Sequence, residues 1–257
     1  MRSVWIFYQK EMLESLRSYK LLWIPVVFII LGIMQPLTTY YMPEILKASG
    51  NVPPGLLEGY VIPGAATVMA QALGQYGSMG MLVLALATMN SLSGERHSGT
   101  VEMVLVRPLT PATLVITKWA ALLTLLLIAL GLGAIAAGYY IEQLIGSLSW
   151  STVLAAASIY GLWLLCAVSM TLLFSAFLRA PVAAFLGLLL TAGLALAHGL
   201  LPSLLDWTPA ALPGLSAQVL SQGGSVSLMG PCLSAGVLIL ICLAGASLMI
   251  RRNILPN

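Results

Sequence analysis

Six long runs of apolar residues limit what this chain can fold into. Each run holds about 20 residues or more, which is the length a helix needs to cross the hydrocarbon core of a bilayer. Backbone polar groups inside that core must be bonded internally, so a run of this kind folds as a helix. The chain has 257 residues, of which 60% are hydrophobic and only 7% are charged. That composition excludes a soluble domain.

We therefore predict an all-α polytopic membrane protein with six transmembrane helices, organised as a single transmembrane domain over residues 1–257. An interfacial amphipathic helix over residues 1–20 precedes the first span, because aromatic residues share one face while Lys10, Glu14 and Arg17 lie on another. The alternative is a polar tail that only carries topogenic charge. The predicted spans are residues 21–41, 64–92, 114–141, 150–178, 182–201 and 230–250.

Basic residues gather on one side of the predicted membrane. When the N-terminus is placed in the cytoplasm, only Lys47 of the eleven Lys and Arg residues falls on the outer side. The positive-inside rule therefore predicts that both termini are cytoplasmic. The N-terminal polar region is long, and no small-residue cleavage site follows the first apolar run. We therefore expect the first span to remain as a signal anchor.

The densest cluster of charge lies in residues 94–111, between the second and third predicted spans. Thr100 is a good N-cap, and Glu102 follows in the first turn, where the helix dipole favours a carboxylate. Pro108 then ends the helix. We predict a helix of about two turns over residues 101–107, lying across the inner mouth of two spans. Its charges and apolar face suit docking onto another protein, and an ordinary solvated loop is the simpler alternative.

The end of this turn predicts where the third span begins. Thr110 can cap a helix that has Pro111 at its first position. Lys118 then lies about 10 Å into the span at the helical rise of ~1.5 Å per residue. Its ammonium group can extend back to the inner surface, or it can pair with an acid such as Glu95 or Glu102.

Polar side chains also form a stripe on the second span. Gln71, Gln75 and Ser78 are spaced so that they share one helix face. Amide groups inside a bilayer are expected to face a protein interior or a water-filled cavity. The stripe therefore lines either a substrate pathway or a subunit interface, and plain hydrogen bonding between helices is the simpler alternative.

The sequence lacks the motifs on which several classes of enzyme and metal-binding protein depend. There is no phosphate-binding loop of the G-x-x-x-x-G-K-[ST] type, so ATP hydrolysis by this chain is not expected. His97 and His198 fall on opposite sides of the membrane, and His198 is either a relay or ligand or, more simply, a residue of the wet interface. We assign no role to Asp206, and residues 201–230 are predicted to form short helical pieces that lie at the outer interface or dip into it. We predict no catalytic residue and no metal site, and we interpret as apolar fillers the cysteines Cys166, Cys232 and Cys242.

On these features the chain resembles the membrane-spanning permease of ABC-2-type ABC transporters, of the bacterial exporter kind whose ATPase is a separate subunit. The resemblance covers nearly the whole chain, from the N-terminal helix through six spans. Its most specific part is a Glu–Arg, Gly–Thr, Glu, Pro and Lys run around the turn after the second span. In this sequence the run comprises Glu95, Arg96, Gly99, Thr100, Glu102, Pro108 and Lys118.

The resemblance implies an exporter in the bacterial plasma membrane, formed by two permease copies, or by this chain and a paralogue, together with ATPase subunits that bind the ATP. It implies no cofactor in this chain and no nucleic acid partner. Rival classes are a membrane scaffold or assembly factor, and a secondary carrier driven by an ion gradient, which the lack of a mid-span acid disfavours. The residues it implies for coupling to the ATPase are Glu95, Arg96, Gly99, Thr100, Glu102, Arg107 and Lys118.

Overall fold

The computed structural model describes residues 2–48, 61–97, 110–222 and 227–254, and every regular element in this part of the chain is helical. The elements are α1 (Arg2–Arg17), α2 (Lys20–Ala48), α3 (Ala65–Gln75), the π-helical turn η1 (Tyr76–Gly80), α4 (Met81–Thr88), α5 (Asn90–His97), α7 (Pro111–Leu144), α8 (Trp150–Ser175), α9 (Ala180–Leu200), α10 (Pro202–Leu205), the 3-10 turn η2 (Pro209–Ala211), α11 (Leu212–Gln222) and α12 (Met229–Ile254).

Six of these helical stretches are long and apolar enough to cross a membrane, which confirms the predicted fold class. They are α2, the α3–α5 stretch, α7, α8, α9 and α12. The first span is longer than predicted, because α2 continues through Pro36 and Pro43 to Ala48. Prolines do not end a membrane helix when neighbouring groups satisfy the freed carbonyls. The third span begins at Pro111, capped by Thr110 as its sequence predicts.

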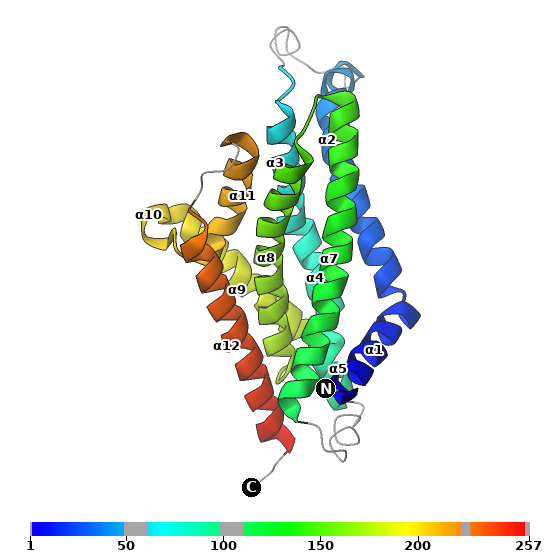
Figure 1. The fold of residues 1–257 in the computed structure, drawn as a ribbon, viewed down its shortest axis with the longest axis vertical. Coiled ribbons are helices and arrows are strands. Elements are labelled where there is room, and N and C mark those ends of the chain that lie inside the picture. Colours follow the sequence, from blue (N-terminus) through cyan, green and yellow to red (C-terminus); the bar gives the residue numbers. More distant parts are fainter. Residues whose placement is uncertain (1, 49–60, 98–109, 223–226, 255–257) are drawn as a thin grey trace.

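The N-terminal helix is confirmed in α1, which ends at Arg17 and meets α2 at a sharp bend (Figure 1). Tyr19 makes this bend with a φ of 58°, a left-handed conformation that is uncommon for residues other than glycine. In Figure 1, α1 slopes away from the spans at the end of the molecule where both chain termini lie. Trp5 and Ile6 are 60% and 61% exposed on it, as an interfacial helix requires.

The bundle is built around α8, which packs against α4, α7, α9, α11 and α12. In its most apolar stretch 67% of the residues are buried, compared with 22% in α9. The exposed faces of α9 and α12 are apolar, as is expected where a helix meets lipid. A second contact joins α2 to α7 along their lengths.

The end of the bundle opposite the chain termini is uneven. In Figure 1, α9 and α12 end on that side well below the level reached by α2 and α7. The predicted helical pieces between the last two spans are present as α10, η2 and α11. Of these pieces, α11 corresponds to the alternative in which a piece dips into the bundle, since it stands alongside α3 and α8. It does so because Leu212, Ser216, Val219 and Leu220 form one face, which is buried against those helices.

Candidate coupling site at the inner face

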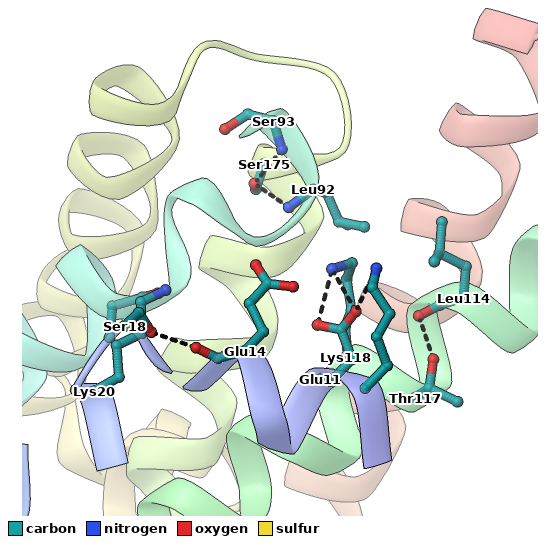
Figure 2. Close-up of polar contacts among 12 residues, drawn as sticks. Glu11, Glu14, Ser18, Lys20, Leu92, Ser93, Leu114, Thr117, Lys118 and Ser175 are labelled. Atoms are coloured by element: carbon teal, nitrogen blue, oxygen red, sulfur yellow. Dashed lines mark hydrogen bonds and ion pairs between the residues drawn. The ribbon is translucent and has the colours of Figure 1, made fainter. Parts of the chain in front are cut away.

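A buried ion pair joins α1 to α7 near the ends of the spans that lie on the same side as the chain termini. Lys118 Nζ lies 3.0 Å and 2.9 Å from the two carboxylate oxygens of Glu11. Lys118 is 2% exposed and Glu11 is 8% exposed, so both charges are largely removed from water. Figure 2 shows the carboxylate of Glu11 facing the ammonium group of Lys118 between the two helices. A charge-assisted pair of this kind holds α1 and α7 at a set distance.

The sequence pattern places Glu11 toward α7 rather than toward water. Glu11 follows Tyr8 by three residues, so the two side chains share a face of α1. The Tyr8 hydroxyl is hydrogen-bonded to Thr124 of α7 at 2.9 Å, which orients that face. Lys118 was expected to extend to the inner surface or to pair with an acid such as Glu95 or Glu102, whose side chains lie outside the described residues. The ion pair that the structure describes is with Glu11. Sequence reasoning missed Glu11, although an acid on the apolar face of α1 is the signal that could have found it.

A small polar cavity of about 80 Å³ lies beside the ion pair. Glu11, Glu14, Lys20 and Lys118 line it, so its walls carry two acids and two bases, and Asn90 of α5 completes one side. Lys20 also donates to the backbone carbonyl of Ala87 at 3.1 Å. The cavity thus brings residues of the consecutive helices α1 and α2 together with residues of α5 and α7, which come much later in the sequence.

The inner end of the second span is attached to α8 through one hydroxyl group. Ser175 Oγ accepts hydrogen bonds from the backbone N–H groups of Leu92 and Ser93 at 3.2 Å and 3.1 Å. The same hydroxyl donates to the carbonyl of Met89 at 2.7 Å. These bonds span the break between α4 and α5, where backbone groups lose helical partners. Ser175 therefore fixes α5 onto the end of α8.

The predicted coupling residues fall on both sides of the boundary of the described structure. Glu95 and Arg96 belong to the last turn of α5, and the orientation of their side chains lies outside the described residues. The predicted helix over residues 101–107 also lies outside them, together with the remaining candidates Gly99, Thr100, Glu102 and Arg107. Lys118 is the candidate whose contacts the structure describes, and it places the start of α7 against α1.

The amide stripe on the second span contacts the first span. Gln75 Nε2 donates to Gln35 Oε1 at 2.6 Å, and Gln35 Nε2 donates to Gln71 Oε1 at 2.8 Å. Gln35 was not among the predicted residues. Ser78 donates within its own helix to the carbonyl of Gln75 at 3.2 Å. Both Gln71 and Ser78 keep exposed surface, so hydrogen bonding between helices accounts for only part of the stripe.

The stripe ends at the π-helical turn η1. The ring of Tyr76 is buried there and stacks on Phe28 of α2, with ring centroids 4.9 Å apart. Its hydroxyl donates to the carbonyl of Phe28 at 3.1 Å. Turns of this type interrupt regular helices and often occur at functional positions.

His198 and Asp206 are remote from the ion pair of Glu11 and Lys118. The described residues contain no group of three or more His, Cys, Asp or Glu side chains that could hold a metal ion. His198 lies near the end of α9, with its Nδ1 atom buried and unpartnered in this part of the chain. Asp206 and Trp207 line a separate pocket of about 430 Å³ between α11 and the start of α12.

Comparison with known proteins shows the family to which this chain belongs. A family model described as ABC-2 family transporter protein matches residues 5–209, well over half of the chain. The chain belongs to the ABC-2 transporter family. It is also similar to the uncharacterized transmembrane protein YxlG of Bacillus subtilis (strain 168), with 33% identity over 237 residues that make up 92% of each chain.

Membership of the ABC-2 family confirms the resemblance drawn from the charged turn and the six spans. The match begins in α1 and includes α5 and the start of α7. The Glu11–Lys118 pair, the polar cavity and the contacts of Ser175 therefore all lie within the ABC-2 part of the chain. ABC-2 proteins of this kind are membrane components that typically work with an ATPase.

Proposed function

We propose that this chain is the permease subunit of an ATP-driven exporter. It acts as a pair, either with a second copy or with a paralogue, and forms the translocation pathway. ATP is bound and hydrolysed by a separate ATPase subunit at the inner face, because this chain lacks a phosphate-binding loop. Membership of the ABC-2 family supports this assignment.

The observation that carries the proposal is the buried Glu11–Lys118 pair. It joins the interfacial helix α1 to the span α7, with its atoms 2.9 Å and 3.0 Å apart. Separating two buried charges leaves each without compensation, which typically costs about 3–5 kcal/mol. A displacement of α1 by a partner protein is therefore passed to α7 rather than absorbed at their contact.

A second connection joins α5, at the start of the charged segment, to α8. The charged segment 94–111 begins within the last turn of α5, and Ser175 bonds α5 to the end of α8. A partner that binds this segment consequently acts on the second, third and fourth spans together. We propose that closure of the ATPase dimer displaces α1 and this segment, and that the two bundles rock between inward-open and outward-open states.

Co-purification tests the assignment directly. The tagged chain is extracted gently from native membranes, and its partners and their ATPase activity in lipid discs are measured. We expect a stoichiometric ATPase subunit whose binding is lost when residues 95–102 are replaced by a Gly-Ser segment. A chain that purifies alone, with no nucleotide-dependent partner, favours a scaffold or an ion-driven carrier instead.

Glu95 provides a sharper test of coupling. Glu95→Ala is expected to lower transport-linked ATPase activity at least tenfold while expression changes little, because Glu95 lies in the last turn of α5, beside the proposed docking surface. Glu142→Ala, at an exposed acid on the opposite end of α7, is the matched control and should retain activity. Unchanged coupling in Glu95→Ala would count against this docking surface.

A further inference from the structure

The amide stripe leaves hydrogen-bonding groups exposed at a depth where water is scarce. Gln35 lies 15 residues after Lys20 and five residues before Tyr40 on α2. At a rise of ~1.5 Å per residue, these separations are about 22 Å and about 7.5 Å along the helix. Tyr40 and Tyr41 suit the outer headgroup region, so the amides lie in the outer half of the hydrocarbon core.

The three amides form a chain of bonds whose two end groups both lack a partner among the described residues: the buried Gln75 Oε1 and the Nε2 group of the exposed Gln71. Gln75 donates to Gln35, and Gln35 donates to Gln71. The Nε2 group of Gln71 donates to no group in the described part of the chain, and its side chain is exposed. Lipid tails offer no acceptor to such a group, so a surface that carries it is poorly suited to face lipid.

The same surface allows another helix to come close. Gly74 is exposed between the two amide positions, and no atom lies within 4 Å of the position that a Cβ would occupy there. Ser78 is also exposed, four residues further along the helix. Small residues at this spacing permit close approach of backbones between membrane helices, and polar side chains beside them bond across the contact.

We infer that this amide face, formed by Gln71, Gly74 and Ser78, meets the same face of a second copy of this chain. The inference rests on the proposed function in one respect, namely that the permease works as a pair. Two copies with the same topology are related by a two-fold axis along the membrane normal, so each residue near the axis meets its own counterpart at equal depth.

A carboxamide suits such an axis because it is self-complementary. It carries two donors and one acceptor oxygen, so Gln71 of one copy can donate to Gln71 of the other and accept in return. A charged side chain at this position would instead repel its own copy. The exposed faces of α9 and α12 carry apolar residues such as Leu189 and Leu240, which lipid satisfies without a protein partner.

Disulfide cross-linking in native membranes tests the inference. The native cysteines Cys166, Cys232 and Cys242 are replaced by alanine, and single cysteines are introduced as Gln71→Cys or Ser78→Cys. The controls are Leu233→Cys and Leu240→Cys, at positions of α12 that are 60% and 67% exposed. Size-exclusion chromatography of each variant confirms that it folds. Copper phenanthroline should link the first two variants into dimers at least tenfold faster than the controls.

Each alternative for this face predicts a different result. If it lines an aqueous pathway, Gln71→Cys reacts with a membrane-impermeant maleimide and forms no dimer, and the inference is overturned. If it faces lipid, cross-linking at Gln71 and Ser78 is as slow as at Leu233 and Leu240, which overturns it equally. Either result leaves the ATPase co-purification unaffected, so the proposed function is tested separately.

A second variant examines the hydrogen bond itself without introducing a cysteine. Gln71→Leu keeps a side chain of similar size that is stable in lipid and removes the amide. Self-association in lipid discs is expected to weaken roughly 3- to 20-fold, the range for hydrogen bonds between membrane helices. Leu233→Ala is the control and should leave the association constant unchanged. An unaltered constant in Gln71→Leu would refute the role of the amide.

Discussion

At the scale of single residues, the most informative feature is a charge placed where it needs a partner. Lys118 lies about two turns inside a membrane span and is 2% exposed, so its ammonium group cannot be hydrated as on a surface. Glu11 compensates it from a helix that is 107 positions away in sequence. A pair of this kind is weak evidence for net stability, but the loss of either partner alone is severe.

Removing the cation should therefore destabilise the protein strongly. Lys118→Met leaves the buried Glu11 with only the half-exposed Lys10, whose Nζ lies 3.7 Å from its carboxylate. We therefore expect a loss of about 3 kcal/mol in the free energy of unfolding, at the lower end of the range for breaking a buried ion pair. The double variant Glu11→Leu, Lys118→Met should recover most of that loss, because no charge remains buried. Thermal unfolding of the purified protein in detergent measures both effects.

The control for this experiment is Arg17→Met, which removes an exposed charge from the same helix α1. It should shift the midpoint of unfolding little, since exposed charges contribute at most about 1 kcal/mol. If Lys118→Met destabilised the protein no more than Arg17→Met, the pair would not be what joins α1 to α7.

At the scale of elements, close contact between spans depends on which small residues face a neighbour. Gly133 of α7 has no room for a side chain: a Cβ would lie 2.6 Å from the Tyr76 hydroxyl and 2.9 Å from the Phe28 carbonyl. Gly131, two residues earlier on the same helix, has open space at the corresponding position. Gly133 therefore lies where α7 packs tightly against α2 and Tyr76, whereas Gly131 lies outside this contact.

These two glycines provide a matched pair of substitutions. Gly133→Ala should destabilise the bundle by about 1–3 kcal/mol, because the added methyl group displaces Tyr76 or the backbone of α2. Gly131→Ala should be neutral or slightly stabilising, since alanine is the better helix former. Thermal unfolding of both variants in the same detergent makes the comparison. Equal effects at the two positions would show that α2 and α7 do not approach each other in this way.

At the scale of the whole molecule, the placement of charge predicts the orientation in the membrane. The short turn after α8 carries Arg179, while the outer turn between α7 and α8 carries no basic residue. Cytoplasmic loops hold an excess of Lys and Arg, so the first turn is expected inside and the second outside.

Cysteine labelling in intact cells measures this orientation. Ser147→Cys, in the exposed turn between α7 and α8, should react with a membrane-impermeant maleimide added outside. Phe177→Cys, which is 37% exposed and next to the inner turn, should react only after the membrane is permeabilised. The reverse pattern would mean that both termini lie outside, which is incompatible with an inner-face ATPase acting on α1 and α5.

What the sequence by itself determined are properties that depend on neighbouring residues. Apolar length defined the spans, and Thr110 and Pro111 defined the start of α7. Each of these is a local signal, because hydrophobic length and helix capping involve residues within one or two turns. The family resemblance was readable for the same reason, since its run of residues is contiguous around one turn.

Only the tertiary structure decided which side chains meet. It paired Lys118 with Glu11 and joined Gln35 to Gln71 and Gln75. It also placed Gly133 in a tight contact with α2 and left open space beside Gly131. A helix in a membrane can turn about its own axis without changing its hydrophobic length, so its sequence does not state which face meets which neighbour. Packing between helices sets that rotation, through contacts between residues that lie far apart along the chain.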